Sequence, residues 1–293
     1  MFKNTRIFAE SWNVAWRKID AGNIMNNKKE KFNIIKNNLL YWAADPFLFE
    51  YQNDTYIFAE LYDYIHCRGT IGYCKLNENG KMRWKKIIIE DYHLSYPYIT
   101  TQGNDIYIIP ESGENNSLYV YKAINFPDKW EKAYMIRRKV KYGDTTPFKY
   151  KNHNYALTYD VSDNNIYKLV LLDLEDKNND TVVGIDEFGD RRPAGKIKFE
   201  DNYLLRPAQN CEHKYGEGII FYKGGISAEN KYFEKEILRV DPYCFKYSKD
   251  IYLDGMHTYN SINKYEVIDI KTRRFNIINL LFRFINKVGR KIK

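Results

Sequence analysis

Short runs of alternating apolar and polar residues fill most of the chain, and short polar turns separate them. The stretches 44–60, "ADPFLFEYQNDTYIFAE", and 95–112, "SYPYITTQGNDIYIIPES", both show an aromatic-rich run, a polar turn and a second aromatic-rich run. A period of two residues is typical of a half-buried strand, and Asn, Asp or Gly between two such runs indicates a hairpin turn. The pattern therefore predicts a series of antiparallel β-hairpins.

The hairpin pattern returns about every fifty residues, at 145–160, at 192–210 and, in a looser form, at 257–269. In each copy a Pro or a small polar residue precedes the first strand. Further strand-like stretches lie between the copies, among them "GTIGYCKL", "SLYVYKA", "IYKLVLLDL" and "GIIFYKGGI". Each repeat thus holds about four strands, which is the content of one propeller blade.

Five copies predict an all-β fold, a five-bladed β-propeller over residues 1–271, followed by a C-terminal amphipathic helix over residues 272–293. The early stretch "SWNVAWRKI", at 11–19, is expected to complete the last blade and close the ring. The alternative is a β-sandwich whose Tyr-rich hairpins resemble one another by coincidence. The ordered recurrence of five hairpins favours the propeller.

The composition agrees with strands, because 27 Tyr and 16 Phe accompany only 16 Gly and aromatic side chains fit a pleated, half-buried surface. The four cysteines form no CxxC pair, and the opening residues "MFKNTRIFAESWNVAW" lack the apolar core of a signal peptide. We therefore expect a cytoplasmic protein. No group of residues has metal-ligand spacing, so neither a metal nor another cofactor is predicted.

The formal net charge of +8 is concentrated at the C-terminus. Residues 272–293 carry seven Lys or Arg and no acidic residue, whereas the other 271 residues carry 39 basic and 38 acidic ones. A basic face across the propeller is therefore not expected. Because such a face is the usual mark of a nucleic-acid binder, no nucleic-acid partner is predicted.

The same C-terminal segment, "TRRFNIINLLFRFINKVGRKIK", has apolar residues three or four positions apart with cations on the flanks. This spacing is typical of a basic amphipathic helix. The segment is too interrupted by charge to span a bilayer, but it suits the anionic inner face of a membrane. A terminal helix packed on the propeller, or one that binds a partner protein, explains the pattern equally well.

Residues at the starts of the five innermost strands should face one another, because blades are arranged around a central channel. Polar residues at these starts, and at the ends of the second strands, form the predicted site. The predicted catalytic residues are Asp45, Glu60, Glu111 and Asp144. The predicted substrate-binding residues are Trp42, His93, Ser95, Tyr96, Arg192, Arg206, Gln209, Asn210, Tyr215 and His257.

A ring of buried carboxylates indicates either an active site or a salt-bridge ring that seals the channel, since an unpaired buried carboxylate is costly. The first alternative fits chemistry at the anomeric carbon of a sugar. Such chemistry needs one carboxylate at an oxocarbenium-like centre and a second group that donates or accepts a proton. Trp42, Tyr96 and Tyr215 are expected to stack on the faces of the sugar.

The cationic residues in the predicted ring indicate the chemical class of the donor substrate. Arg192, Arg206 and His257 are more than a simple hydrolase needs, and guanidinium groups recognise phosphate through paired hydrogen bonds. These residues predict a glycosyl phosphate or a nucleotide sugar as the donor substrate.

Seven motifs also carry a resemblance to a known family: "ADPFLFE", "HLSYPYI", "IYIIPES", "NFPDKW", "RRPAGKI", "LLRPAQNCEHKYG" and "HTYN". Together and in order they resemble the five-bladed propeller domain at the N-terminus of glucosamine inositolphosphorylceramide transferases. That domain is similar to the glycoside hydrolase propellers of the arabinanase, β-fructosidase and levansucrase group. The resemblance covers about residues 10 to 270.

The resemblance implies roles for two aspartates. It makes Asp45 the base or nucleophile and Asp144 the residue that orients it and tunes its pKa. The hydrolases carry their acidic glutamate on a later blade, where this chain has Arg192, Arg206 and Gln209. Glu212 lies nearby in the sequence, and Glu60 and Glu111 are candidates on other blades, so the resemblance leaves the general acid unassigned.

The resemblance also implies a place in the assembly of bacterial-type surface polysaccharides. The main hypothesis is a membrane-surface glycosyltransferase that uses a sugar-phosphate or nucleotide-sugar donor and a glycan acceptor. In the plant relatives a separate transferase domain follows the propeller, and this sequence leaves no room for one. A glycoside hydrolase and a non-catalytic glycan-binding propeller are the two alternatives.

Overall fold

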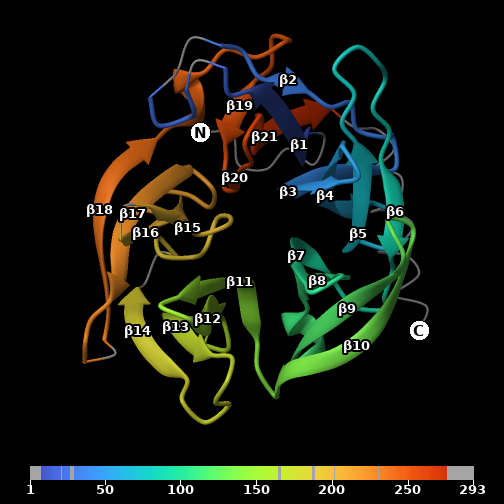
Figure 1. Ribbon diagram of the computed structural model, residues 1–293. Helices are drawn as coiled ribbons and strands as arrows, with labels where there is room; N and C mark the ends of the chain where they lie inside the picture. Colours follow the sequence, from blue (N-terminus) through green and yellow to red (C-terminus); the bar gives the residue numbers. More distant parts are fainter. Residues whose placement is uncertain are drawn as a thin grey trace, which may run out of the picture.

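The computed structural model describes residues 8–20, 22–26, 30–163, 166–186, 189–200, 202–229 and 231–275. These residues form β-strands and two short 3₁₀ helices, η1 (Gly113–Asn115) and η2 (Pro242–Cys244). Five antiparallel sheets stand around a common centre as the blades of a propeller (Figure 1). The predicted all-β, five-bladed propeller is confirmed.

Each of the first four blades is one continuous stretch of chain. Blade 1 contains β3 (Tyr41–Tyr51), β4 (Asp54–Asp63), β5 (Arg68–Lys75) and β6 (Lys85–Ile88). Blade 2 contains β7 (Ser95–Gln102), β8 (Asp105–Glu111), β9 (Ser117–Asn125) and β10 (Lys129–Arg138). Blade 3 contains β11 (Tyr142–Tyr150), β12 (His153–Asp160), β13 (Tyr167–Asp173) and β14 (Thr181–Asp186). Blade 4 contains β15 (Lys198–Glu200), β16 (Tyr203–Asn210), β17 (Gly218–Ile226) and β18 (Tyr232–Val240).

The fifth blade combines the two ends of the described chain. It contains β19 (Leu253–Gly255), β20 (Tyr259–Ser261), β21 (Tyr265–Phe275), β1 (Phe8–Lys18) and β2 (Asn33–Ile34). Strands β1 and β21 pair along their whole length, from Phe8 opposite Phe275 to Lys18 opposite Tyr265. The N-terminal strand therefore closes the ring, as the sequence predicted.

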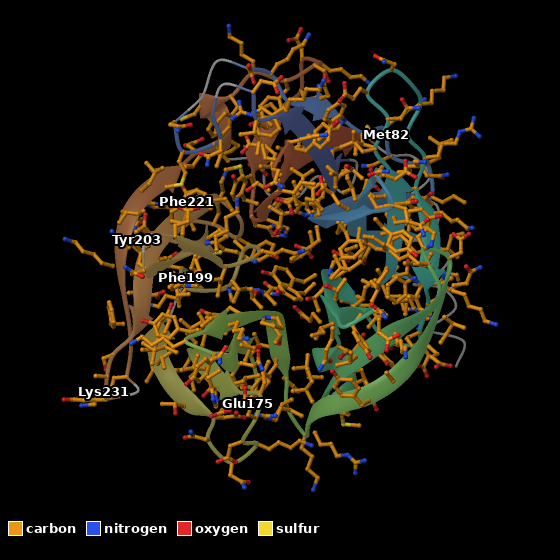
Figure 2. The ribbon with its side chains drawn as sticks, in the orientation of Figure 1. Met82, Glu175, Phe199, Tyr203, Phe221 and Lys231 are labelled. Atoms are coloured by element: carbon orange, nitrogen blue, oxygen red, sulfur yellow. The ribbon has the colours of Figure 1, made fainter. Side chains whose placement is uncertain are left out.

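Apolar side chains fill the interfaces between neighbouring blades rather than the centre of the ring (Figure 2). Successive side chains of a strand point to opposite faces, so each inner strand supplies two interfaces. In β3, Phe47 belongs to the cluster between blades 1 and 2, and Leu48 to the cluster between blades 5 and 1. This division leaves the channel to polar residues.

The predicted C-terminal helix is not supported. Its first residues, from Thr272 to Phe275, continue β21, because β1 offers this stretch a complete set of backbone partners. The Thr272 hydroxyl donates a hydrogen bond to the carbonyl oxygen of Ser11 at 3.1 Å. Residues 276–293 lie outside the described residues, so contact with a membrane surface stays a prediction. Within the described ranges, no helix combines the length and hydrophobicity that crossing a bilayer requires.

Gly195 marks a very close contact between blades 4 and 5. Its φ is +147°, and a Cβ at this position would lie 1.8 Å from the carbonyl oxygen of Tyr259. Gly195→Ala must therefore push the segment before β15 away from β20. We expect it to lower the free energy of unfolding by at least about 3 kcal/mol in urea titrations.

Gly103→Ala is the matched control. Gly103 also has a positive φ, +60°, but a Cβ there would meet no atom within 4 Å. We expect only the cost of the left-handed backbone, about 1–2 kcal/mol. Equal losses in the two variants would contradict the steric explanation.

Candidate active site

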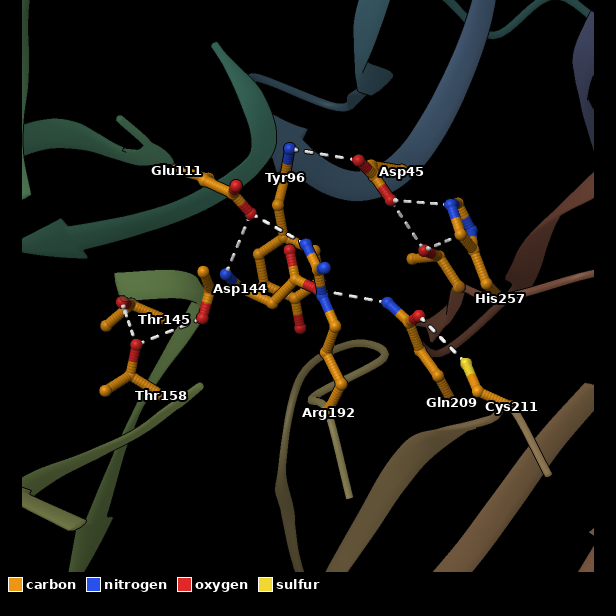
Figure 3. Close-up of polar contacts among 12 residues, drawn as sticks. Asp45, Tyr96, Glu111, Asp144, Thr145, Thr158, Arg192, Gln209, Cys211 and His257 are labelled. Carbon is orange, nitrogen blue, oxygen red and sulfur yellow. Dashed lines mark hydrogen bonds and ion pairs between the residues drawn. The ribbon is translucent and has the colours of Figure 1, made fainter. Parts of the chain in front are cut away.

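Three blades begin with the same backbone distortion. A β-bulge interrupts the pairing between the first and second strands of blades 1, 2 and 3. The bulges contain Asp45, Tyr96 and Asp144, whose φ angles are 51°, 46° and 50°. A non-glycine residue in this region costs about 1–2 kcal/mol and persists only where its surroundings hold it. Bulges redirect side chains, and these three turn the strand starts toward the centre (Figure 3).

Carboxylates of one blade hold the distorted start of the next blade. Asp269 of β21 accepts a hydrogen bond from the backbone N–H of Asp45 at 3.1 Å, and Asp45 accepts one from the N–H of Tyr96 at 3.2 Å. Glu111 of β8 accepts one from the N–H of Asp144 at 3.3 Å. These bonds join blade 5 to 1, blade 1 to 2 and blade 2 to 3. The carboxylates are therefore structural as well as chemical groups.

The strand starts surround a pocket with a volume of about 190 Å³. The predicted residues that line it are Trp42, Asp45, Glu60, His93, Ser95, Glu111, Asp144, Arg192, Tyr215 and His257. Trp12 and Tyr62 also line it and were not predicted. Alternation along β4 could have found Tyr62, since it lies two residues from Glu60. Trp12 reaches the pocket only because β1 closes the ring.

Asp45 is buried in the pocket wall. Its Oδ1 accepts a hydrogen bond from the Thr258 hydroxyl at 2.8 Å, and Nε2 of His257 lies 3.8 Å from the same oxygen. Burial raises the pKa of Asp45 to about 6, the charge of Asp144 adds to the shift, and His257 opposes it. Asp45 is therefore mostly ionised at pH 7 and can serve as a base or nucleophile.

Glu60 differs from the other carboxylates of the pocket. Its buried Oε1 has no hydrogen-bond partner in the described part of the chain, and Nε2 of His93 lies 3.5 Å from it, at the limit of a hydrogen bond. Burial, together with the charges of Asp45 and Glu111, raises the pKa of Glu60 well above its usual value. This environment disfavours the ionised form of Glu60.

His93 presents one defined nitrogen to Glu60. Its Nδ1 accepts a hydrogen bond from the backbone N–H of Gly69 at 2.9 Å. Burial lowers the pKa of His93, which favours the neutral ring. With Nδ1 as the acceptor, the ring proton lies on Nε2, the nitrogen nearer to Glu60.

Asp144, Glu111 and Arg192 form a second cluster in the pocket (Figure 3). Arg192 donates hydrogen bonds from Nη2 to Glu111 at 2.9 Å and from Nε to Asp144, and Gln209 donates to Asp144 at 3.0 Å. One guanidinium thus faces two carboxylates. Burial raises the pKa of Asp144 to about 7 although Arg192 opposes the shift, and Glu111 adds to it. The cluster can therefore gain or lose a proton near neutral pH.

His257 is fixed by Asp269 and by an aromatic ring. Its Nδ1 lies 2.5 Å from Oδ2 of Asp269, and Trp12 stacks on the imidazole with ring centroids 3.9 Å apart. Burial alone would lower the pKa of His257, but the charges of Asp269 and Asp45 outweigh it and raise the pKa. These charges favour the protonated form of His257, whose Nε2 lies 3.8 Å from Oδ1 of Asp45.

Asp45, His257 and Asp269 are the described residues whose ligand atoms come close enough to hold a metal ion, within 4.8 Å of one another. Each oxygen of Asp269 already accepts two hydrogen bonds, from Asp45, His257 and Thr258. A metal ion would have to displace these bonds. We therefore assign Asp269 to positioning Asp45 and His257.

Tyr96 corrects one prediction, because it does not line the pocket. Its side chain is completely buried, and its hydroxyl contacts the Thr146 hydroxyl at 2.8 Å and accepts a hydrogen bond from the N–H of Gly195 at 2.7 Å. Tyr96 therefore cannot stack on a sugar. It links blades 2, 3 and 4 instead.

Three residues of β16 also lie outside the pocket lining. Arg206 is buried against Glu234, with two hydrogen bonds of 2.8 Å, so it cannot bind the phosphate of a donor. Gln209 lies on the opposite face of the strand and supports Asp144 from behind. Asn210 accepts a hydrogen bond from the N–H of Glu212 and shapes the following loop. The sequence correctly predicted that β16 lies near the pocket, but it did not show which way these three side chains point.

Aromatic rings stand on two sides of the pocket. Trp42 and Tyr62 are cross-strand neighbours in blade 1, stacked with centroids 4.7 Å apart. On the other side, Tyr215 meets the ring of His257 edge-on at 5.4 Å. The lining thus combines acidic groups with flat apolar surfaces, which suits a sugar ring.

Comparison with known protein families tests the resemblance found in the sequence motifs. A family model described as "Glucosamine inositolphosphorylceramide transferase 1, N-terminal" matches residues 34–243. The chain belongs to this family. The matched segment runs from β2 to just beyond blade 4, so the resemblance found in the motifs is confirmed.

The plant members are longer proteins. Glucosamine inositolphosphorylceramide transferase 1 of Arabidopsis thaliana is 28% identical over 249 residues, which are 78% of this chain and 30% of that protein. The protein of the same name from Oryza sativa subsp. indica is 26% identical over 197 residues, 62% of this chain and 26% of that protein. The chain thus spans less than a third of each of these relatives.

Solved structures share the fold at low identity. The catalytic domain of the Coprinopsis cinerea GH62 α-L-arabinofuranosidase has a TM-score of 0.58 at 10% identity, covering 89% of this chain and 98% of that domain. Zg3597, a family 117 glycoside hydrolase of Zobellia galactanivorans, has a TM-score of 0.54 at 10% identity, covering 90% and 91%. These likenesses show the propeller fold alone.

The raised pKa of Glu60 predicts a pH-dependent stability. A carboxyl whose folded-state pKa lies above its unfolded value stabilises the fold at low pH and loses that contribution as the pH rises. Each unit of pKa elevation is worth about 1.4 kcal/mol. As the pH rises from 5 to 8, the free energy of unfolding of Glu60→Gln, measured by urea titration, should therefore increase relative to that of the parent protein.

Glu131→Gln, at an exposed position of β10, is the control and should keep the pH dependence of the parent protein. If the Glu60→Gln variant also kept the pH dependence of the parent protein, Glu60 would not hold a proton in the folded state.

Proposed function

We propose that the pocket binds the terminal unit of a neutral glycan and breaks the bond at its anomeric carbon, passing the glycosyl group to a hydroxyl acceptor. The observation that carries this proposal is Glu60, a buried carboxyl with an unpartnered oxygen and a raised pKa. It shares the pocket with Asp45, which is mostly ionised at pH 7. Two carboxyl groups in opposite protonation states are what glycosidic bond chemistry requires.

The two carboxyl groups take different steps. Glu60 donates its proton to the leaving oxygen of the glycosidic bond as that bond breaks. Asp45 either removes the proton of the acceptor hydroxyl as its oxygen displaces the leaving group, or attacks the anomeric carbon itself. In the second case the acceptor hydroxyl gives its proton to the ionised Glu60 and displaces Asp45 in a second step. Asp144 faces the same space and adjusts the charge near Asp45, in agreement with the role that the family resemblance implies.

Charge pairing favours a neutral substrate. Arg192 is paired with Glu111 and Asp144, and His257 with Asp269, so the cations at the pocket are already neutralised. The volume of about 190 Å³ lies below the roughly 300–1,000 Å³ of pockets that enclose drug-sized ligands. Both observations support a single sugar ring rather than a nucleotide sugar.

The acceptor hydroxyl belongs to a glycan in this proposal, and the setting is the assembly of a surface polysaccharide. The plant relatives are named glucosamine inositolphosphorylceramide transferases, and this name supports the transfer of a sugar unit. Transfer from a sugar phosphate or nucleotide sugar is the second candidate. It is favoured by the Arg192 side chain, which is 21% exposed at the pocket.

The assignment is tested by measuring catalytic turnover by the parent protein and by the variants Asp45→Asn and Glu60→Gln. The substrates are a panel of 4-nitrophenyl glycosides and neutral oligosaccharides, offered with and without acceptor sugars. We expect each variant to lose at least about 100-fold in kcat, since proton transfer by a positioned group contributes about 10²–10⁴-fold. Glu131→Gln is the control and should keep full activity.

The outcomes separate the candidates. Full turnover in a folded Asp45→Asn variant would contradict its role. Turnover only with a nucleotide sugar or glycosyl phosphate would select the second candidate, and free sugar without acceptor dependence would indicate hydrolysis. Sugar binding without turnover on any substrate would indicate a glycan-binding protein.

The pH profile of kcat/KM provides a further prediction. Asp45 must lose its proton to act, so activity should rise as the pH increases through about 6, the pKa of Asp45. Activity should fall at higher pH, where Glu60 loses its proton. In Glu60→Gln the residual activity should no longer fall on the alkaline side. A profile that is flat from pH 5 to 7 would argue against Asp45 as the base or nucleophile.

A further inference from the structure

His93 and Glu60 face each other in the pocket, and each has a hydrogen-bonding atom that is not in use. Oε1 of Glu60 is buried and accepts no hydrogen bond from the described residues. Nε2 of His93 lies 3.5 Å from this oxygen and forms no closer hydrogen bond within the described ranges. A donor without an acceptor thus stands beside an acceptor without a donor, slightly beyond the ordinary hydrogen-bond distance.

The proton of the His93 ring lies on the nitrogen that faces Glu60. A backbone N–H can only donate, and that of Gly69 donates to Nδ1 of His93 at 2.9 Å. Burial lowers the pKa of His93 and favours the neutral ring, which carries one proton. Because Nδ1 is occupied as an acceptor, that proton lies on Nε2. His93 therefore presents a hydrogen-bond donor to Glu60.

Backbone contacts on two sides hold His93 in place. The N–H of Leu94 donates to the carbonyl oxygen of Gly69 at 3.1 Å, so the connection between blades 1 and 2 is fixed to β5. Glu114 of η1 accepts a hydrogen bond from the N–H of His93. Gly69 leaves no space for a side chain, since a Cβ there would lie 2.9 Å from Cε1 of His93 and closer still to Oε1 of Glu60. The imidazole and the carboxyl are thus held against each other beside Gly69.

The charged groups that face this pair are mostly acidic. The charges of Glu114 and Asp45 favour the protonated form of His93, and that of Arg192 opposes it. An ionised Glu60 is repelled by the carboxylates around it, and burial disfavours its charge further. A hydrogen bond from His93 would offset part of this cost. The carboxylates that face Glu60 are Asp45, Glu111, Asp144 and Asp269, from blades 1, 2, 3 and 5.

We propose that His93 is a positioning residue for Glu60, and that its Nε2–H donates a hydrogen bond to the carboxylate that remains after Glu60 has given its proton to the leaving oxygen. While Glu60 is neutral the two groups stay 3.5 Å apart. Hydrogen bonds to a charged oxygen are shorter, and a movement of about half an ångström closes this one. The role rests on the function proposed for Glu60, but the pair can be tested without turnover.

The pKa of Glu60 can be measured by ¹³C NMR of the full chain labelled at the glutamate Cδ, with Glu60→Gln identifying the resonance. His93→Phe keeps a ring but removes the donor, so the pKa of Glu60 should rise by about one unit. His93→Gln offers an amide N–H to the same carboxylate and should restore most of the difference. His153→Phe, at the start of β12 in blade 3, is the control and should leave the pKa of Glu60 unchanged.

Turnover gives a second readout. In His93→Phe the fall of kcat/KM at alkaline pH should move upward with the pKa of Glu60, and kcat should drop several-fold while KM stays within about twofold. A raised KM with an unmoved pKa of Glu60 would overturn the proposal and assign His93 to binding the substrate. If no substrate turned over, the NMR titration would still decide whether His93 stabilises the ionised Glu60, so failure of the reaction and failure of the pair can be told apart.

The same pKa of Glu60 in His93→Phe and in the parent protein would contradict the proposal. If His93→Phe failed to fold, ¹⁵N NMR of the parent protein would decide the matter. The Nε2 resonance of His93 should move as the pH rises through the pKa of Glu60, and this movement should be absent in Glu60→Gln. A resonance that stays in place in the parent protein would refute the hydrogen bond.

Discussion

Hydrogen bonds from backbone N–H groups to carboxylates of the preceding blade are the interaction on which the site depends. Asp269 holds the start of blade 1, Asp45 the start of blade 2 and Glu111 the start of blade 3. The strand starts need this support, because a left-handed backbone at Asp45, Tyr96 and Asp144 is otherwise unfavourable. Two of these three carboxylates, Asp45 and Glu111, also line the pocket.

Glu60 differs from the other carboxylates of the pocket in its hydrogen bonding. Asp45, Glu111 and Asp144 are tied to backbone groups or to Arg192, whereas Glu60 has a buried oxygen with no hydrogen-bond partner among the described residues. Desolvation without compensation disfavours the charged form of such a group. The supply of hydrogen bonds thus separates Asp45, Glu111 and Asp144 from Glu60.

Four carboxylates line the pocket, and burial together with the charges of neighbouring carboxylates raises the pKa values of Asp45 and Glu60. Arg192 and His257 lie among them, and each is paired with a carboxylate. Tyr96 lies behind the pocket, where its hydroxyl accepts a hydrogen bond from the N–H of Gly195 at 2.7 Å and connects blade 2 to blade 4.

The sequence by itself determined the propeller, its five hairpins and the closure by the N-terminal strand, because alternation and turn residues are local signals that recur in register. It also located the strand starts, and with them Asp45, Asp144 and most of the other residues that line the pocket. Only the tertiary structure decided which way Arg206 and Tyr96 point and that Trp12 enters the pocket. It also singled out Glu60. Those facts depend on bulges, on burial and on contacts between blades far apart in the chain, which no local pattern of residues encodes.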